Sequence, residues 1–422
     1  MTTSIIPQKP SFTIKQNIFW LDKFAKRGLL NRLNKITKGS LRLIDSGSVY
    51  HFGNQNNNIE CRATIKVKDS RFYSAIAFGG SVAAGESYFL GYWECDDLTT
   101  LVRILLINRD VLDGMDESFS RIQAPIMQLL HWLSRNTRKG SQRNISAHYD
   151  LGNDLFKLFL DKNMMYSSAI YPNDTCSLED ASNYKLERIC QKLQLSKNDH
   201  VLEIGTGWGG FAIYAAENYG CRVTTTTISQ EQYDLAQHRI KEKGLSRRIT
   251  VLLSDYRDLD GKFDKLVSIE MIEAIGHQYI NTYFQKCSDL LKSNGMMLLQ
   301  AITIADQRYK SALKEVDFIK RYIFPGCFIP SNNAMQNAIT NSSDMRLFNL
   351  EDIGPHYART LNDWRTRFSN NIEAVKSLGY PEEFVRLWEF YLCYCEGGFI
   401  ERAISNVQLT LVKPNNRVNF PV

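Results

Sequence analysis

The sequence lacks an apolar run of the ~18 residues that a membrane-spanning helix requires. Residues 1–15 also lack the apolar core of a secretory signal peptide. The nine cysteines are scattered, and none has the CxxC or Cys–His spacing of a zinc or redox site. We therefore expect a cytoplasmic protein whose thiols are reduced and which binds no metal.

Acidic charge is scarce in the first third of the chain. Residues 1–147 contain 20 Lys and Arg against 12 Asp and Glu, a net charge of +8, whereas the remaining residues carry −2 of the total of +6. A basic face can meet nucleic acid, anionic lipid or solvent. No RNA- or DNA-binding motif accompanies this charge, so a lipid surface is the favoured partner and nucleic acid is not expected.

Residues 1–134 predict a small α+β domain. Apolar residues recur at helical spacing from Lys15 to Lys38, with basic residues on the other surfaces. This helix either lies on a membrane surface or packs on its own domain with a solvated basic face, and the sequence does not separate the two. Residues 135–147 are polar and basic and predict a linker. The other expected elements of this domain are strands over 40–44, 49–52 and 61–67 and helices over 96–106 and 121–134.

From His148 onward, strands alternate with helices. The predicted strands are 200–204, 222–227, 249–253, 265–270, 296–303, 347–353 and 407–412. This alternation indicates a parallel sheet with helices on both faces. Residues 148–422 are therefore predicted to form one Rossmann-like α/β domain.

A glycine-rich turn follows the first of these strands, in the segment Val201-Leu-Glu-Ile-Gly-Thr-Gly-Trp-Gly-Gly210. Glycine permits positive φ and close approach of a ligand, and the helix that follows offers free N–H groups. The segment also meets the dinucleotide pattern Gly-x-Gly-x-x-Gly. The acidic residue that binds ribose at the end of the second strand is missing, however, and Thr224-Thr-Thr-Thr-Ile-Ser-Gln230 stands there. A dinucleotide site and a plain tight turn remain as alternatives.

Motifs over about residues 146–412, and more weakly over the N-terminal domain, resemble the cyclopropane-fatty-acyl-phospholipid synthases. These enzymes depend on S-adenosylmethionine (SAM) and have mycolic-acid and tuberculostearic-acid relatives. The resemblance implies a class I SAM methyltransferase sheet, and the last predicted strand fits the antiparallel strand that such sheets add. The matching motifs are His148-Tyr-Asp-Leu-Gly-Asn-Asp154, Met165-Tyr-Ser167, Glu203-Ile-Gly-Thr-Gly-Trp-Gly-Gly210, Thr227-Ile-Ser-x-x-Gln232, Asp255-Tyr-Arg-Asp258, Ser268-Ile-Glu-Met-Ile-Glu-Ala-Ile-Gly276, Tyr322-Ile-Phe-Pro-Gly326 and Tyr394-Cys-Glu-Gly-Gly-Phe399.

The resemblance implies a SAM site built from these motifs. Thr and Gln side chains can bind ribose or adenosine in place of a carboxylate, and a tyrosine ring can lie against adenine. The residues that it implies are Tyr166, Ser167, Gly205, Gly207, Gly209, Thr227, Gln232 and Tyr256.

The implied reaction transfers the SAM methyl group to a cis double bond of a phospholipid acyl chain. A cation forms, and proton loss closes the cyclopropane ring. Aromatic faces suit such a cation, although aromatic residues are more often simply core. The candidates are Tyr149, Tyr166, Tyr283, Phe284, Tyr322 and Phe324.

In the family the base is a bound bicarbonate ion, whose ligands carry over as Glu273, the backbone of Ile302, and Tyr357. Two like charges repel, so Glu273 must share a proton or a hydrogen bond with this ion. Alternatively, Glu273 is a carboxylate that only stabilises the start of a helix.

Three further positions complete the predicted catalytic set. A cysteine typically follows the Tyr-Ser pair, and here Ser168 stands there. A histidine usually stands at the position of Gln300, and glutamine cannot take a proton as histidine can. Plant-type members share this glutamine, which suggests that cyclopropanation survives. Cys395 matches a cysteine once assigned to the active site, but a structural thiol is the simpler interpretation.

We therefore predict a SAM-dependent cyclopropane synthase that acts on unsaturated phospholipid. It would associate peripherally with the inner face of the membrane, and a homodimer is one further expectation. Methyl or methylene branching of the same alkene is the nearest alternative, since it differs only in the proton that is lost. A non-catalytic lipid- or SAM-binding relative is the alternative from another class.

Overall fold

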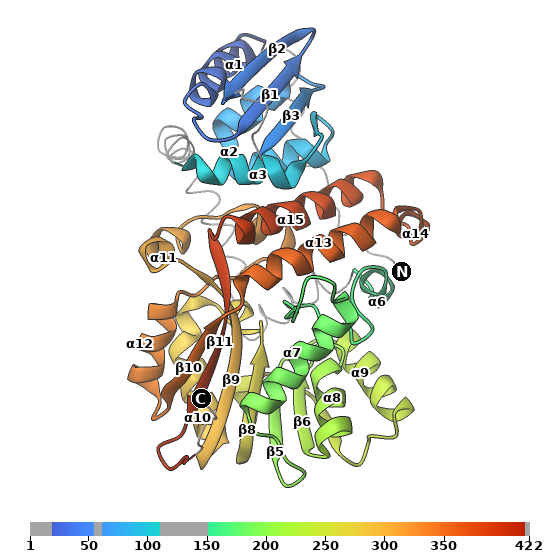
Figure 1. Ribbon diagram of the computed structural model, residues 1–422, viewed down its shortest axis with the longest axis vertical. Coiled ribbons are helices and arrows are strands. Elements are labelled where there is room, and N and C mark those ends of the chain that lie inside the picture. Colours follow the sequence, from blue (N-terminus) through green and yellow to red (C-terminus); the bar gives the residue numbers. More distant parts are fainter. Residues whose placement is uncertain (1–18, 55–60, 110–150, 418–422) are drawn as a thin grey trace. The chain divides into compact units, whose positions relative to one another are not determined.

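The computed structural model describes residues 19–54, 61–109 and 151–417 (Figure 1). The chain divides into two compact units. Unit 1 comprises Met1–Leu133, Glu315–Ile323 and Ile372–Glu401, and unit 2 comprises Ser134–Lys314, Phe324–Asn371 and Arg402–Val422. The helix predicted over 121–134 and the linker predicted over 135–147 lie outside the described residues.

Unit 1 contains a four-stranded sheet in the order β2-β1-β3-β4. The alternating segments of the sequence do form β1, β2 and β3, with β1 parallel to β3. The Asp97 side chain accepts the N–H of Thr100 at 2.9 Å and so begins α3, as its position predicts. The elements are α1 (Phe19–Leu33), β1 (Ser40–Asp45), β2 (Ser48–Gly53), β3 (Arg62–Val67), α2 (Arg71–Phe89), β4 (Trp93–Cys95), α3 (Leu98–Ile107), η4 (Ile319–Ile323), α14 (Ile372–Ser377) and α15 (Glu382–Ile400).

Unit 1 extends beyond the predicted boundary at residue 134, because α15 packs on α2 and α3. The hydroxyl of Tyr88 donates to Glu389 at 2.8 Å, and the hydroxyl of Thr99 donates to Glu396 at 3.1 Å. Gly397 lies so close to Val102 that an added Cβ would stand 2.7 Å from its side chain. The helix α15, near the C-terminal end of the chain, therefore completes the core of unit 1. The residue periodicity within a single segment does not reveal this packing.

Unit 2 contains a seven-stranded sheet in the order β10-β11-β9-β8-β5-β6-β7. Strands β9, β8, β5, β6 and β7 are parallel, and β11 is antiparallel to both β9 and β10. Its elements are α6 (Asn153–Lys157), α7 (Leu178–Lys192), β5 (His200–Ile204), α8 (Gly210–Tyr219), β6 (Arg222–Thr227), α9 (Gln230–Glu242), β7 (Ile249–Leu253), η1 (Tyr256–Asp258), β8 (Phe263–Ile269), η2 (Ile272–Ala274), η3 (His277–Tyr279), α10 (Ile280–Leu290), β9 (Leu291–Ile304), α11 (Asp306–Ala312), α12 (Asn332–Ser342), β10 (Arg346–Asp352), α13 (Gly354–Asn370) and β11 (Ile404–Val412).

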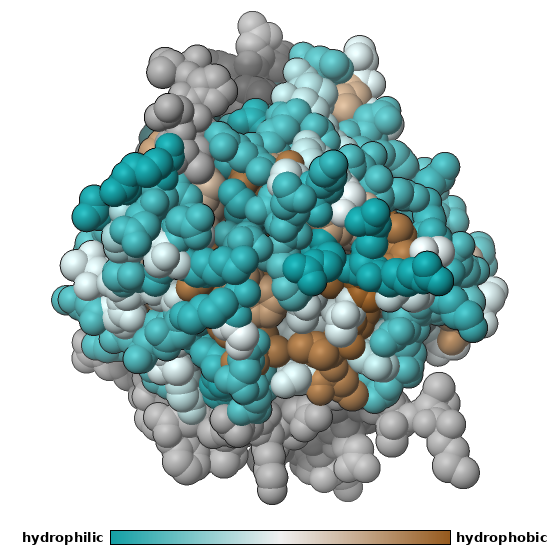
Figure 2. Space-filling view, turned by 90° about the horizontal axis from the view of Figure 1, so that it is seen from below, coloured by the Kyte–Doolittle hydropathy of each residue, from teal (hydrophilic) through white to brown (hydrophobic). Residues whose placement is uncertain are grey.

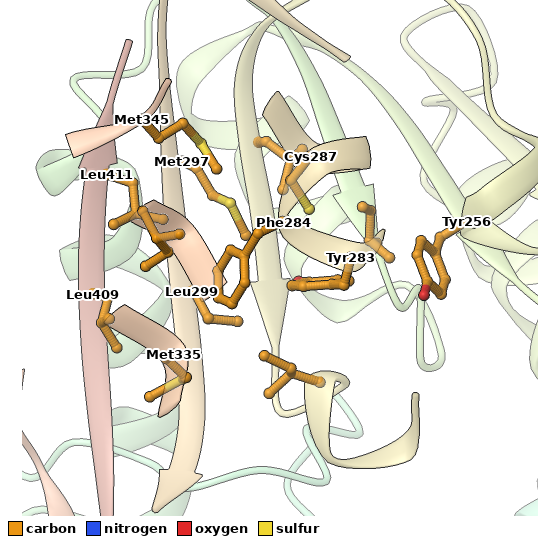
Figure 3. Close-up of a cluster of buried hydrophobic side chains, with 14 of the residues drawn as sticks. Tyr256, Tyr283, Phe284, Cys287, Met297, Leu299, Met335, Met345, Leu409 and Leu411 are labelled. Atoms are coloured by element: carbon orange, nitrogen blue, oxygen red, sulfur yellow. The ribbon is translucent and has the colours of Figure 1, made fainter. Parts of the chain in front are cut away.

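Two apolar cores cover the two faces of this sheet. Along β5, Val201 packs with α7 and α8, whereas the next residue, Leu202, packs with α10 and α12. Figure 3 shows part of the second core, with Tyr283 and Phe284 of α10 among methionine and leucine side chains from β9, α12 and β11. The predicted α/β sheet with helices on both faces is confirmed.

The surface seen from below in Figure 2 is mostly hydrophilic, and its apolar residues occupy small areas. Within the described ranges, no helix is both long and apolar enough to cross a bilayer. A hollow at the amino-terminal ends of β5 and β8 is polar, since its lining includes Asp199, Asp264 and Lys265. The side chains predicted to act in chemistry follow the opposite ends of these strands.

Candidate active site

The glycine loop follows β5 and is tied to the end of the neighbouring strand. The N–H of Gly205 donates to the carbonyl of Thr226 at 3.1 Å. Gly205, Gly207 and Gly209 have φ values of 102°, 51° and 86°. A Cβ on Gly205 would also stand 3.1 Å from Cγ of Met271, so both conformation and space favour glycine. The free N–H groups at the start of α8 then border the loop.

The predicted Tyr166-Ser167 pair lies beside this loop. The Phe156 ring lies between Tyr166 and Trp208, a residue of the loop. Its ring centroid is 5.2 Å from that of Tyr166 and 4.9 Å from that of Trp208. Trp364 also contacts the Tyr166 ring, at 5.3 Å. The buried hydroxyl of Ser167 accepts a hydrogen bond from the Lys185 ammonium at 2.7 Å. The structure thus brings together two motifs that are about forty residues apart in the sequence.

Thr227 and Gln232 contact each other at the end of β6. The Thr227 hydroxyl donates to the side-chain carbonyl of Gln232 at 2.8 Å, and Ser229 caps α9 between them. The Gln232 carbonyl is thereby occupied, which leaves its amide as the donor for a ligand. Both side chains are buried beside β5, the strand that leads into the glycine loop.

Tyr256 follows β7 and packs edge-to-face on Tyr283, with 5.5 Å between ring centroids. Figure 3 shows it at one end of the buried cluster. Its hydroxyl is buried and has no hydrogen-bond partner among the described residues. An unpaired buried hydroxyl is costly, so a polar group of a bound cofactor fits this position.

The threonine-rich strand serves partly as internal support. The Thr225 hydroxyl donates at 2.6 Å to Glu203, the acid that precedes the loop. Burial raises the pKa of Glu203 to about 8, so this carboxyl is mostly protonated at neutral pH. Glu203 therefore links the ends of β5 and β6 as a neutral group. Because it is protonated, it presents no negative charge to a cofactor.

A ring of donors surrounds Glu270, the residue directly after β8. Its Oε1 accepts the N–H of Ser168 at 3.0 Å and the amide of Gln300 at 2.8 Å. The amide of Asn406 donates to the same oxygen. The hydroxyl of Tyr357 donates to Oε2 at 2.8 Å. Three of these donors, Ser168, Gln300 and Tyr357, are residues predicted from the sequence, whereas the sequence predicts no role in the site for Glu270.

Glu270 has two unusual properties. Its φ is +49°, in the left-handed region that costs a side-chain-bearing residue about 1 kcal/mol. It is partly buried, whereas Ser168, Gln300 and Asn406 are fully buried. The carboxylate is therefore held by donors that are more deeply buried than Glu270 itself.

Glu273, the predicted bicarbonate ligand, lies one turn further on. Its Oε1 accepts the N–H of Ile302 at 2.6 Å. Its Oε2 is buried and has no partner in the described part of the chain. Burial, with the nearby charge of Glu270, raises the pKa of Glu273 to about 8. Near neutral pH, Glu273 is therefore mainly a neutral acid whose proton can be donated.

Lys185 is a cationic side chain close enough to Glu270 for the two charges to interact. It is fully buried, and burial lowers its pKa to about 8, while the charges of Glu270 and Asp161 oppose that shift. A sequence pattern gives no hint of this lysine, since it lies on α7 among residues typical of an amphipathic helix.

The predicted bicarbonate site fits the structure poorly. The Tyr357 hydroxyl donates to Glu270, and the Ile302 N–H donates to Glu273, so both expected anion donors serve carboxylates of the chain. Ser168 and Gln300 serve Glu270 as well. A further anion here would face Glu270 at close range. In the structure, Ser168, Gln300 and Tyr357 are linked through Glu270, and Ile302 is linked to Glu273.

Residues 136–409 match the model of the mycolic acid cyclopropane synthetase family. The chain belongs to this family. It is 37% identical over 345 residues to the cyclopropane-fatty-acyl-phospholipid synthase of Escherichia coli (strain K12), covering 81% of this chain and 86% of that protein. It is 35% identical over 352 residues to the tuberculostearic acid methyltransferase UfaA1 of Mycobacterium tuberculosis, covering 79% of each.

A solved structure of the mycolic acid cyclopropane synthase CmaA1, complexed with SAH and CTAB, is similar to this chain with a TM-score of 0.61 and 30% identity. The match covers 64% of this chain and 98% of that one. Family membership and the methyltransferase fold expected from the sequence are thus confirmed.

Within this family frame, the predicted residues separate into two groups. The SAM-loop residues and the set around Glu270 all lie in unit 2, whereas Cys395 lies on α15 in unit 1. Of the aromatic candidates, Tyr166 and Phe324 pair at 6.3 Å, while Tyr283 and Phe284 are fully buried in the core. Tyr322 belongs to unit 1. Tyr149 lies outside the described residues.

Proposed function

We propose that this protein is a SAM-dependent methyltransferase that adds a methylene group across a cis double bond of an unsaturated phospholipid acyl chain. The observation that carries this proposal is the adjacency of the glycine loop to the Glu270 carboxylate and the donors that hold it. Gly205 of the loop packs on Met271, the residue directly after Glu270. The resemblance to cyclopropane synthases of two lineages supports the same chemistry.

The chain's own residues have distinct tasks in this reaction. SAM, when bound, supplies an electrophilic methyl group. The loop Gly205–Gly209, the Gln232 amide and the Tyr256 hydroxyl orient the cofactor. The rings around Tyr166 offer negative faces to a cation on the lipid chain and exclude water from it. The ring of donors holds the Glu270 carboxylate, a group that can take up a proton.

A bicarbonate ion as the base remains an expectation from the resemblance, and the geometry argues against it. Its expected donors are taken up by Glu270 and Glu273.

Methyl or methylene branching of the same alkene is the second candidate. The 35% identity to a tuberculostearic acid methyltransferase favours it. The two outcomes share one cation and differ in which proton is lost. Cyclopropyl and methylene products have equal mass, so mass alone does not separate them.

The test is incubation of the purified chain with methyl-labelled SAM and vesicles of an unsaturated phospholipid. Cyclopropyl proton signals in the NMR spectrum of the extracted lipid are the expected result. Olefinic methylene or methyl-branch signals would favour the second candidate. Absence of S-adenosylhomocysteine release would support a non-catalytic relative and contradict the proposal.

Because the proposed substrate is a phospholipid, the proposed reaction takes place at a membrane surface. We propose peripheral association with the inner, cytoplasmic face, supported by the net charge of +8 over residues 1–147. Co-sedimentation with anionic vesicles that weakens with added salt is expected, because charge attraction is screened. Equal binding to neutral vesicles would contradict this. A homodimer remains a prediction, which light scattering of the purified chain will test.

A further inference from the structure

The donors expected to hold an external anion instead hold a carboxylate of the chain. Ser168, Gln300, Asn406 and Tyr357 direct four hydrogen-bond donors to Glu270. These donors come from four separate parts of the chain. They converge on a residue whose backbone φ is strained. Such convergence is typical of a site in which one particular group must be held.

A glutamate carboxylate and a bicarbonate ion present the same acceptor unit, two oxygens on one planar carbon. A donor set that fits one of them therefore fits the other. Both together would place two anions side by side, and the nearby cation, Lys185, already donates to Ser167. We propose that the Glu270 carboxylate takes the place of the bicarbonate ion and is the catalytic base of this enzyme. This inference rests on the proposed function.

The proton transfer balances without an external anion. The alkene electron pair forms a bond to the methyl carbon, and the carbon–sulfur bond breaks with its electron pair remaining on sulfur. A C–H bond of the transferred carbon then breaks, and its electron pair closes the ring on the cationic carbon. The proton passes to Glu270, which becomes a neutral acid and later releases that proton to solvent.

Oε2 is the oxygen of Glu270 that suits this step. Oε1 accepts three hydrogen bonds, whereas Oε2 accepts the one from Tyr357 among the hydrogen bonds described here. Oε2 is therefore the less occupied of the two oxygens and the one on which the substrate proton can be received. Glu270 is also less buried than the residues that hold it, which are all buried.

The deciding experiment compares turnover of the unaltered full-length protein in carbon-dioxide-free buffer with turnover after addition of sodium bicarbonate. The substrates are methyl-labelled SAM and vesicles of dioleoylphosphatidylglycerol. We expect the two rates to agree within about twofold. A rate that collapses without bicarbonate and returns with it would overturn the inference, and this arm needs no variant that has to fold.

Two variants test the carboxylate directly. Glu270→Gln keeps the size of the side chain and is expected to lower kcat by about 100-fold or more, because a base typically contributes that much. Glu270→Ala opens a space lined by the same donors, and bicarbonate is expected to raise its activity by about tenfold. Glu187→Gln, which alters a carboxylate bonded to Tyr214 and Tyr219, is the matched control with unchanged turnover.

A second readout does not depend on turnover. The ¹³C NMR signal of labelled bicarbonate is expected to broaden with Glu270→Ala and to stay sharp with the unaltered protein. Binding of S-adenosylhomocysteine by calorimetry verifies that each variant is folded. Broadening by the unaltered protein, or near-normal activity of Glu270→Gln, would overturn the inference.

The outcomes separate this inference from the proposed function. Methyl transfer that requires bicarbonate contradicts the role of Glu270 and leaves the methyltransferase proposal intact. Absence of methyl transfer under both conditions overturns the proposed function, and the inference with it.

Discussion

The loop Gly205–Gly209 and the ring around Glu270 follow neighbouring strands, β5 and β8, but they are built in different ways. The loop is a continuous piece of backbone whose shape depends on positive φ values. The ring consists of the backbone N–H of Ser168 and the side chains of residues 270, 300, 357 and 406, held by hydrogen bonds between distant parts of the chain. The cofactor part of the site is thus local in sequence, and the chemical part exists only in the folded protein.

The largest effect that would test this contrast is expected from Gly205→Val. Valine at φ 102° is strained, and its side chain would meet Met271. We expect affinity for S-adenosylhomocysteine to fall by about 100-fold, since the loop can no longer approach the ligand. Calorimetry measures it. Gly244→Val, with φ 67° and open space, is the control that shares the conformational cost of ~1 kcal/mol. Equal loss of affinity in both variants would contradict a role for the loop.

Gln300→Leu is expected to have the next largest effect. It removes a donor to Glu270 and leaves the buried amide of Gln408 without its acceptor. We expect kcat to fall by about 10- to 100-fold, while the affinity for S-adenosylhomocysteine changes by less than about twofold. Rapid-quench turnover and calorimetry give the two values. A parallel loss of both would show that the two regions are one structural unit.

Glu273→Gln is expected to have a smaller effect, below about fivefold on kcat at pH 7, because Glu273 is already mainly neutral. This differs from the expectation that a bicarbonate ligand would create, which is complete loss of the product. Comparison of initial rates for this variant and for Glu270→Gln distinguishes the two acids. Abolished activity in Glu273→Gln with SAM binding retained would restore the bicarbonate interpretation.

The same variant has a signature in stability against pH. The pKa of Glu273 in the folded protein, about 8, lies above the usual carboxyl value, so the folded state favours the protonated form. Its stabilising contribution is complete below about pH 4.5 and is lost as pH rises to about 8. Glu273→Gln cannot ionise, so its stability relative to the unaltered protein should rise between these pH values. Urea unfolding at pH 5 and pH 9 measures this, and a constant difference would contradict the shifted pKa.

Cys395→Ser is expected to have the smallest effect, less than about twofold on kcat. The thiol lies on α15 in unit 1, and alkene methylation needs no thiol nucleophile. Turnover with the standard vesicles is the measurement. A loss comparable with that of Gln300→Leu would restore Cys395 to the predicted active site.

The sequence predicted the fold well where the signal was local. Strands β5, β6 and β7 have the bounds that their apolar patterns indicate, and the glycine turn lies where the motif put it. Residues 354–377 form two helices, α13 and α14, separated at Asn371, whose side-chain amide donates to the distant Leu158 carbonyl. The affiliation of α15 with unit 1 depends on contacts nearly 300 residues apart.

The site was likewise predictable where its signal lay in a local motif, and not where it depended on contacts between distant residues. Ser168, Gln300 and Tyr357 were identified through the resemblance, yet the residue that they hold was not, because nothing in the string Ser268-Ile-Glu-Met marks Glu270 as more than the end of a strand. Lys185 and Asn406 likewise carry no local signal. A buried charge or amide becomes recognisable only when its partners are known.

The antiparallel strand β11 determines when this site can exist during synthesis. Asn406 and Gln408 reach Glu270 and Gln300 across 136 and 108 residues of sequence. A ribosome that has released β8 and β9 has therefore exposed the glycine loop with its complete backbone, while Glu270 beside it still lacks the donors Tyr357 and Asn406. The nascent protein therefore forms the backbone of the glycine loop early and completes the donor set of Glu270 late. A chain halted before β11 has the loop but lacks the Asn406 donor.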